Sequence, residues 1–139
     1  MTLPPWNKTI TSYEVVNLYK QAICFGGGII SSPKAGCLEQ CLGNAWTAEA
    51  YSQPEGTEQG GLIFACALMV YLARDHCFTD GNKRVAWACL SHILGRLNVQ
   101  IRADDETVVA FVENVAQGQY DIKEALAWVS DRLNPIKMN

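Results

Sequence analysis

Residues 62–84 read LIFACALMVYLARDHCFTDGNKR, and this stretch decides the fold. Its first part, Leu62–Ala73, is the longest apolar run of the chain and predicts a helix that is buried in a core. Polarity returns at Arg74, so the helix is expected to end there. Asp80–Gly81 is a favoured turn dipeptide, and the chain then enters a second helix that begins near Asn82.

The second helix is predicted by apolar residues that recur at helical spacing on one face. These residues are Val85, Ala86, Cys89, Leu90, Ile93, Leu94 and Leu97. No stretch of the chain alternates convincingly between apolar and polar residues as a half-buried strand does. The sequence therefore predicts an all-α fold, a compact domain of about five to seven helices with a polar loop between two central ones.

Further helices are predicted on both sides of the central pair. Thr11 and Glu14 have the spacing of a capping box, which starts a helix, and the three glycines at 26–28 end it. Asp104 and Asp121 each precede a helical pattern and are expected to cap two C-terminal helices.

The chain between the first helix and the central pair carries weaker signals. The glycine-rich stretch Phe25–Ala35 is expected to be a flexible surface segment. A short helix is predicted over Gly36–Leu42 and is ended by Gly43. Trp46–Tyr51 adds another turn or two, and Ser52–Gly61 is predicted to hold a polar loop.

The composition excludes several classes of protein. The chain has 139 residues, of which 49% are hydrophobic and 18% are charged, with a formal net charge of −3. This length suits one domain with its own core, and so few charges exclude an intrinsically disordered tail protein. A net charge of −3 does not provide a broad cationic face, so direct nucleic-acid binding is disfavoured.

Residues 1–10 lack the basic start, apolar core and cleavage site of a signal peptide, which predicts a cytoplasmic protein. The run Leu62–Ala73 is shorter than the ~20 residues that cross a bilayer, so no membrane association is expected. In a reducing cytosol the six cysteines, at 24, 37, 41, 66, 77 and 89, are expected to be free thiols. Cys37 and Cys41 share a helix face, but without a second Cys or His pair nearby the spacing favours buried thiols over a zinc site.

The chain has two histidines, His76 and His92. His92 lies in the middle of the second core helix, where a structural or solvated role is expected. His76 opens residues 76–84, which hold a carboxylate, an amide and two cations at a junction between two helices. A helix N-terminus presents unpaired N–H groups and partial positive charge, so this segment is typical of a phosphate site.

Each residue type in this segment has a use at a phosphate. Gly81 lets the backbone come close, Asn82 offers a side-chain donor, and Lys83 and Arg84 supply positive charge. Asp80 offers a hard oxygen ligand for Mg²⁺ on a nucleotide.

His76 is expected to accept the proton of an attacking hydroxyl, and Phe78 to anchor the loop. Simpler interpretations exist for parts of the segment: Asp80–Gly81 alone is typical of a turn or a cap, and a histidine at a helix C-terminus stabilises the dipole. A thiol nucleophile at Cys77 is disfavoured because no second orienting group is evident. The joint pattern favours a phosphate site.

The pattern H-x-F-x-D-G-N-K-R at residues 76–84 resembles the signature of the Fic/Doc superfamily, and in particular of the death-on-curing (Doc) toxins. Lys83 stands where the AMP-transferring Fic enzymes usually carry Gly. The predicted helices follow in the family's order over residues 10–134, which leaves an N-terminal extension at 1–9 and a C-terminal tail at 135–139.

The resemblance implies a Doc-like toxin of a toxin–antitoxin system. Such a toxin transfers the γ-phosphate of ATP, with Mg²⁺, to a hydroxyl, expected to be a threonine, of a translation factor such as elongation factor Tu, and so inhibits translation. His76 would be the catalytic base and Asp80 the metal ligand. The residues that would bind the nucleotide are Arg74, Asp80, Gly81, Asn82, Lys83 and Arg84.

Two alternatives stay open. The first is a Fic-type AMP transferase on the same scaffold, against which the bulky Lys83 argues, as does Trp87 where those enzymes usually have a second Arg. Ala88 in turn departs from Doc, which has Asn there. The second is a catalytically silent binding or repressor module, and the presence of His76 argues against it.

Self-inhibiting Fic proteins carry S/T-x-x-x-E-G/N, whose Glu pairs with the motif Arg. Here Tyr51 precedes Glu55 and Val109 precedes Glu113 at the first position, so the motif is absent and inhibition is expected from outside. By resemblance the partner is a Phd-like antitoxin whose C-terminal segment folds over the site. Phe25–Ala35 is either the family's flap, which holds the target segment extended beside the histidine, or a plain linker.

Overall fold

The computed structural model describes residues 10–136, which form six helices and one two-stranded sheet. In chain order the elements are α1 (Ser12–Gly26), α2 (Cys37–Ser52), α3 (Thr57–Arg74), α4 (Asn82–Arg96), β1 (Val99–Ile101), α5 (Asp105–Ala116), α6 (Ile122–Ser130) and β2 (Leu133–Pro135). The predicted all-α class is confirmed. The predicted extension 1–9 and residues 137–139 of the predicted tail lie outside the described residues.

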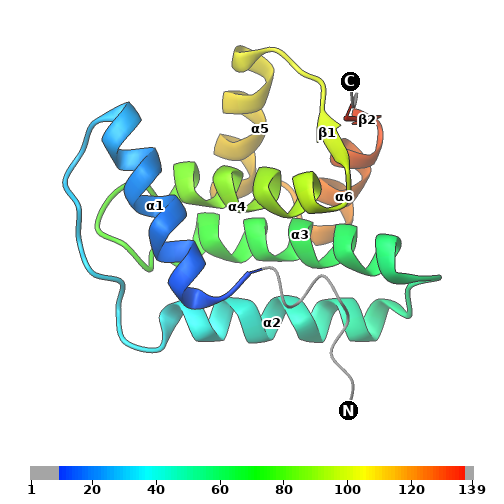
Figure 1. Cartoon of the computed structure of the whole chain (residues 1–139), viewed down its shortest axis with the longest axis horizontal. Coiled ribbons are helices and arrows are strands. Elements are labelled where there is room, and N and C mark those ends of the chain that lie inside the picture. Colours follow the sequence, from blue (N-terminus) through cyan, green and yellow to red (C-terminus); the bar gives the residue numbers. More distant parts are fainter. Residues whose placement is uncertain (1–9, 137–139) are drawn as a thin grey trace.

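Helix α3 is the centre of the fold. It packs between α2 and α4, as Figure 1 shows, and it also contacts α5 and α6. All residues from 63 to 70 are buried, which is why this helix is apolar on every side. Within residues 10–136, no helix combines the length and the apolarity that a membrane span needs.

Three predicted helix starts are confirmed by their caps. The Thr11 hydroxyl accepts a hydrogen bond from the Glu14 N–H at 3.2 Å, and the Asp104 carboxylate accepts one from the Thr107 N–H at 2.8 Å. Asp121 takes part in a reciprocal capping box at the start of α6. These caps satisfy backbone donors that a helix leaves unpaired, so the local sequence sets where α1, α5 and α6 begin.

The predicted end of a helix at Gly43 is wrong, because α2 continues through this residue as a single helix of 16 residues. Leu38, Cys41 and Ala45 of α2 are buried, and α2 packs along α3. A glycine inside a helix costs only about 0.5–1 kcal/mol relative to alanine. Burial of one apolar face outweighs that cost.

The polar loop predicted over Ser52–Gly61 is shorter than expected, because α3 begins at Thr57. Gly60 and Gly61 are buried in the first turns of α3.

The sequence showed no alternating pattern for the two short strands, β1 and β2. They pair antiparallel, with Val99 opposite Pro135 and Ile101 opposite Leu133. Each strand has three residues, which is too short for a visible alternation. The pairing joins the chain after α4 to the chain after α6, and no local pattern encodes it.

Candidate active site

One cleft gathers six of the predicted site residues. It has a volume of about 620 Å³ and lies where the end of α3, the loop before α4, the first turn of α4 and one face of α5 meet. The predicted residues that line it are His76, Asp80, Gly81, Asn82, Lys83 and Arg84. A volume of this size is typical of a site for a small molecule.

His76 lines this cleft with an exposed side chain, which makes no hydrogen bond to another described residue. Its φ is +51°, in the left-handed region that residues other than glycine rarely adopt. It directly follows Asp75, the C-cap of α3. Helices often end with a left-handed residue at this position, and here that residue carries the imidazole.

Asn82 and Gly81 shape the turn between the two central helices. The Asn82 side chain accepts a hydrogen bond from the Phe78 N–H at 3.0 Å and donates one to the Phe78 carbonyl at 2.9 Å. Gly81 has a φ of +81°, and a Cβ added to it would lie 2.6 Å from a methyl group of Ile23. A side chain at 81 would therefore strain the backbone and displace the end of Ile23, which favours glycine there. The Asn82 amide holds the turn closed. Its predicted role as a donor to a phosphate stays a prediction.

Phe78 is 2% exposed and stacks on Tyr19, with ring centroids 3.8 Å apart and an angle of 8° between the ring planes. The stack joins the loop between α3 and α4, residues 75–81, here called the motif loop, to α1. The prediction that Phe78 anchors the loop is confirmed.

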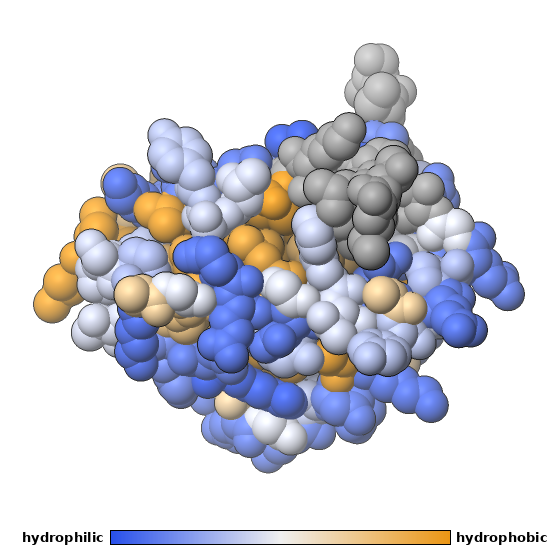
Figure 2. Space-filling model, turned by 90° about the horizontal axis from the view of Figure 1, so that it is seen from below, coloured by the Kyte–Doolittle hydropathy of each residue, from blue (hydrophilic) through white to orange (hydrophobic). Residues whose placement is uncertain are grey.

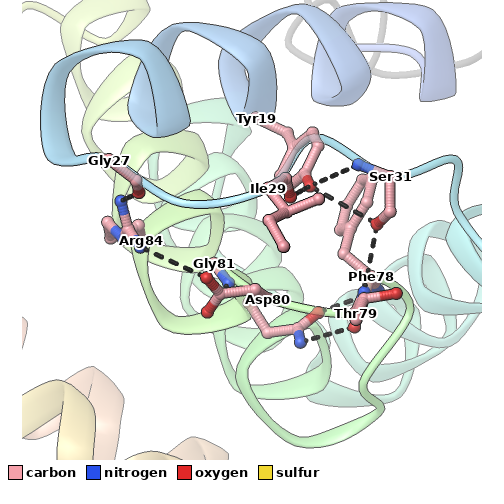
Figure 3. A network of polar contacts seen from close by, with 10 residues as sticks. Tyr19, Gly27, Ile29, Ser31, Phe78, Thr79, Asp80, Gly81 and Arg84 are labelled. Carbon is pink, nitrogen blue, oxygen red and sulfur yellow. Dashed lines mark hydrogen bonds and ion pairs between the residues drawn. The ribbon is translucent and has the colours of Figure 1, made fainter.

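The glycine-rich segment between α1 and α2 lies across the motif loop, as Figure 3 shows. The Tyr19 hydroxyl donates to the Ile29 carbonyl at 3.1 Å and accepts from the Ser31 N–H at 2.9 Å. The Ser31 hydroxyl in turn accepts from the Thr79 N–H at 3.1 Å. The segment is exposed, as expected, and these contacts fix its position relative to the loop.

Two cations flank the first turn of α4, whose N–H groups have no partner within the helix. Lys83 Nζ lies 2.6 Å from a carboxylate oxygen of Glu113. This hydrogen bond and the charge of Lys83 lower the pKa of the Glu113 carboxyl. Arg84 donates to the Gly27 carbonyl and lies 3.8 Å from Asp80 Oδ2. Positive charge is therefore held at the start of α4, where a phosphate would bind.

Arg74 is the predicted site residue that does not line the cleft. Its guanidinium donates to the Val115 carbonyl at 2.9 Å and to the Tyr120 carbonyl. These contacts tie the end of α3 to the end of α5 and to the chain that follows it. The structure thus assigns a structural task to Arg74, and its predicted nucleotide contact stays a prediction.

Glu113 of α5 and Gln117, the residue that caps the end of α5, also line the cleft. The sequence did not identify either as a site residue. They are four residues apart, about one helical turn, and this spacing is the single local sequence signal that their side chains lie on the same side of the helix. Their position beside Lys83 depends on the packing of α5 against α4. His92 lies elsewhere on α4, 3.6 Å from a carboxylate oxygen of Glu14 in α1, which agrees with the structural role expected for it.

The prediction that all six cysteines are free thiols is wrong for one pair. Cys37, the first residue of α2, forms a disulfide with Cys77, the residue after His76. The two are 40 residues apart in sequence, and their Cα atoms lie 5.5 Å apart in the fold. Of the other four, Cys24 is exposed, and Cys41, Cys66 and Cys89 are buried.

Comparison with known proteins gives a family match and a curated relative. The model of the Fic/DOC family matches residues 11–94, more than half of the chain, including the whole motif loop. Toxin Doc of Mycolicibacterium smegmatis is 39% identical over 61 residues, which are 40% of this chain and 47% of that protein. The match therefore spans about half the length of this relative.

Proposed function

Because this chain belongs to the Fic/DOC family, we propose that it is the toxin of a toxin–antitoxin system and acts as a phosphotransferase of the kinase type. It transfers the γ-phosphate of ATP to a hydroxyl, expected to be a threonine, of a translation factor such as elongation factor Tu, and so inhibits translation. The observation that carries this proposal is one cleft lined by His76, Asp80, Lys83 and Arg84. The similarity to Toxin Doc supports the toxin assignment.

The reaction uses these residues in separate roles. The exposed imidazole of His76 accepts the proton of the acceptor hydroxyl while its oxygen forms a bond to the γ-phosphorus. The bond from that phosphorus to the bridging oxygen breaks, and ADP leaves with the electron pair. Lys83, Arg84 and the N–H groups at the start of α4 stabilise the negative charge on the phosphates.

The residues of the cleft fit a nucleotide that carries Mg²⁺. Asp80 Oδ1 accepts from the Gly81 N–H at 2.8 Å, which orients the carboxylate. Asp80 Oδ2 lies 3.8 Å from Arg84 in an ion pair, so a bound Mg²⁺ would share or replace this contact. Mg²⁺ is usually held by one or two carboxylates together with substrate phosphates. When bound, it neutralises part of the phosphate charge during transfer.

The assignment to phosphate transfer rather than AMP transfer rests on α4. Lys83 places a long cationic side chain where the AMP-transferring relatives usually have glycine. Trp87 stands where those enzymes usually have a second arginine, and it lines a separate apolar groove beside Ala22 and Phe25. The cation that would contact the nucleotide phosphates from this position is therefore missing.

The test is to incubate the purified chain with cell lysate and ATP labelled at either the γ- or the α-phosphate. We expect protein labelling from the γ-position alone, and mass spectrometry should place the phosphate on a translation factor. His76→Ala should abolish the signal, whereas His92→Ala, a control on α4 outside the cleft, should keep it. Labelling from the α-position would show AMP transfer instead, and no labelling from either position would favour a silent binding module.

A Phd-like antitoxin is the proposed inhibitor, and the structure has a surface that suits one. An apolar groove of about 570 Å³ adjoins the cleft and shares Lys83, Arg84 and Glu113 with it. Phe25 and Val109 in its lining are 92% and 66% exposed. The apolar face of a helix docks in a groove of this kind, and it would lie directly beside the cations of the site.

Val109→Asp should therefore weaken antitoxin binding by about tenfold or more, because it places a charge in the apolar groove. Phosphate transfer by the free toxin should be unchanged. Tyr51→Asp is the control, since Tyr51 is also exposed, at 84%, but lies at the end of α2. Equal effects of the two substitutions on binding would argue against the groove.

The segment 25–35 is proposed to be the flap that holds the target peptide. Ile29 and Ile30 are 76% and 56% exposed, and Figure 2 shows apolar surface at the end of the molecule where this segment lies in Figure 1. The backbone of Ile30 makes no hydrogen bond to another described residue. An extended peptide could pair with this backbone beside His76.

A further inference from the structure

Three sulfur atoms and one carboxylate gather around a single point next to the motif loop. Cys37 begins α2, Cys41 follows one turn later, and Cys77 follows His76 in the loop. Their Sγ atoms all lie within 4.8 Å of one another. The carboxylate of Asp75, the C-cap of α3, lies 3.4 Å from Cys41 Sγ. The proposed phosphate transfer uses none of these four side chains.

The distances in this cluster are those between ligands of a tetrahedral metal ion. With zinc–sulfur bonds of about 2.3 Å, two sulfur ligands lie about 3.8 Å apart, and a sulfur and a carboxylate oxygen about 3.5 Å apart. Cys41 Sγ lies 3.8 Å from Cys77 Sγ and 3.4 Å from Asp75 Oδ2. The Cys41–Cys77 and Cys41–Asp75 distances therefore already match those between ligands of a tetrahedral zinc ion.

Cys37 supplies the remaining corner once it is reduced. Its disulfide with Cys77 shows that both side chains are directed at the same point, from Cα atoms 5.5 Å apart. Reduction turns both residues into thiols, and rotation about the Cα–Cβ bond of Cys37 lets its sulfur move away from Cys77. The ligands then come from three parts of the fold: the start of α2, the end of α3 and the motif loop.

We propose that the reduced protein binds one zinc ion through the sulfur atoms of Cys37, Cys41 and Cys77 and the carboxylate of Asp75. Thiolate ligands select zinc over Mg²⁺ and Ca²⁺, which prefer oxygen. Each thiol releases its proton on binding, and no electron is transferred. Since the protein fills all four positions, the site is structural and leaves no position for a substrate.

At this position the ion would stabilise the backbone around His76. Asp75 and Cys77 are the two neighbours of His76, so the ion would hold the backbone on both sides of that residue and tie it to α2. The disulfide makes the same connection between α2 and the loop. The ion and the disulfide use the same sulfur atoms, so one molecule holds one or the other.

Metal analysis of the full chain tests this proposal. The protein is purified in the presence of zinc and a phosphine reductant, dialysed, and analysed for zinc by mass spectrometry. We expect one zinc ion per chain, and a thiolate-to-cobalt charge-transfer band when Co²⁺ replaces it. The oxidised protein, with Cys37 and Cys77 joined, should bind neither ion at this site.

Variants test the proposed zinc ligands one at a time. Cys41→Ser and Asp75→Asn should each weaken zinc binding by about tenfold or more, measured by competition with a chromophoric chelator. Cys24→Ser is the control, because Cys24 is exposed and lies outside the cluster, and it should keep one zinc ion. Circular dichroism checks that each variant folds. If Cys41→Ser does not fold, the zinc affinity of Asp75→Asn decides, because Asp75 is exposed. Absence of zinc from the reduced protein, or unchanged affinity in Cys41→Ser, would overturn the proposal.

Discussion

His76 has a backbone conformation that residues with a Cβ adopt at a cost of about 1 kcal/mol or more. Its φ of +51° is at a helix end where glycine is the usual residue. The chain thus carries a histidine where the backbone would prefer glycine. This conformation places the imidazole in the cleft, directly after the end of α3.

Because of this conformation, replacing His76 by glycine should affect activity and stability differently. His76→Gly relieves the strain, although it also adds conformational freedom to the unfolded chain. We expect its free energy of unfolding to lie within about 1 kcal/mol of the natural protein, while γ-phosphate transfer is lost. Denaturant unfolding and the labelling assay measure the two effects. A much larger loss of stability would mean that the imidazole has a structural role, and retained transfer would remove it as the base.

At the scale of single elements, local signals predicted α1, α3, α4, α5 and α6, since their apolar period and their caps lie within a few residues of each other. Helix α2 differs. Gly43 is a local signal for an end, yet the buried face of the helix continues past it. The prediction followed the local signal, but packing against α3 keeps the chain helical through Gly43.

Gly43→Ala should stabilise the protein. Gly43 is exposed in the middle of α2, and a Cβ added there would meet no atom within 4 Å. Alanine lowers the entropy of the unfolded chain, so the free energy of unfolding should rise by about 0.4–1 kcal/mol and Tm by a few degrees, measured calorimetrically. Gly36→Ala should do the opposite, because Gly36 has a φ of +76°. A loss of stability in Gly43→Ala would contradict a continuous α2.

The contact between α4 and α5 pairs Lys83 with Glu113, and this pair bears on the proposed nucleotide site. Glu113 holds Lys83 at 2.6 Å, so under the proposed function a nucleotide would compete with this carboxylate. Glu113→Gln should therefore tighten ATP binding a few-fold, as expected for an exposed ion pair. Titration calorimetry measures the dissociation constant. Glu106→Gln removes an exposed charge from the first turn of the same helix and should leave it unchanged.

The same ion pair has a defined dependence on pH. The pKa of Glu113 is lowered in the folded state by the hydrogen bond and charge of Lys83. Its contribution to stability is therefore present above the ordinary value near 4.5 and is lost as the pH falls through the folded value. Stability curves of the natural protein and of Glu113→Gln should differ slightly at neutral pH and converge in acid. A difference that persists in acid would show that Glu113 acts in another way.

At the scale of the whole molecule, the fold sorts the cysteines into three classes. Cys24 is exposed, the pair Cys37 and Cys77 is oxidised, and the remaining thiols are buried. Burial raises the pKa of Cys66 to about 12 and that of Cys89 further. Very little reactive thiolate is therefore present on the buried thiols near neutral pH.

Thiol titration of the oxidised protein should follow this sorting. In the native state one thiol, Cys24, should react quickly with Ellman's reagent, and Cys24→Ser should remove that fast phase. Denaturation without reductant should expose four thiols, and full reduction should expose all six. Six thiols in the denatured, unreduced protein would show that the disulfide does not form.

The sequence by itself determined the helical class, most helix starts and the composition of the motif loop, because these depend on residues that are close together in the chain. The tertiary structure alone decided that α2 runs through Gly43, that β1 pairs with β2 and that Glu113 faces Lys83. It also brought Cys37, Cys41 and Asp75 to Cys77. These features join segments that are distant in the chain, and they exist only after α3 has been packed between its neighbours.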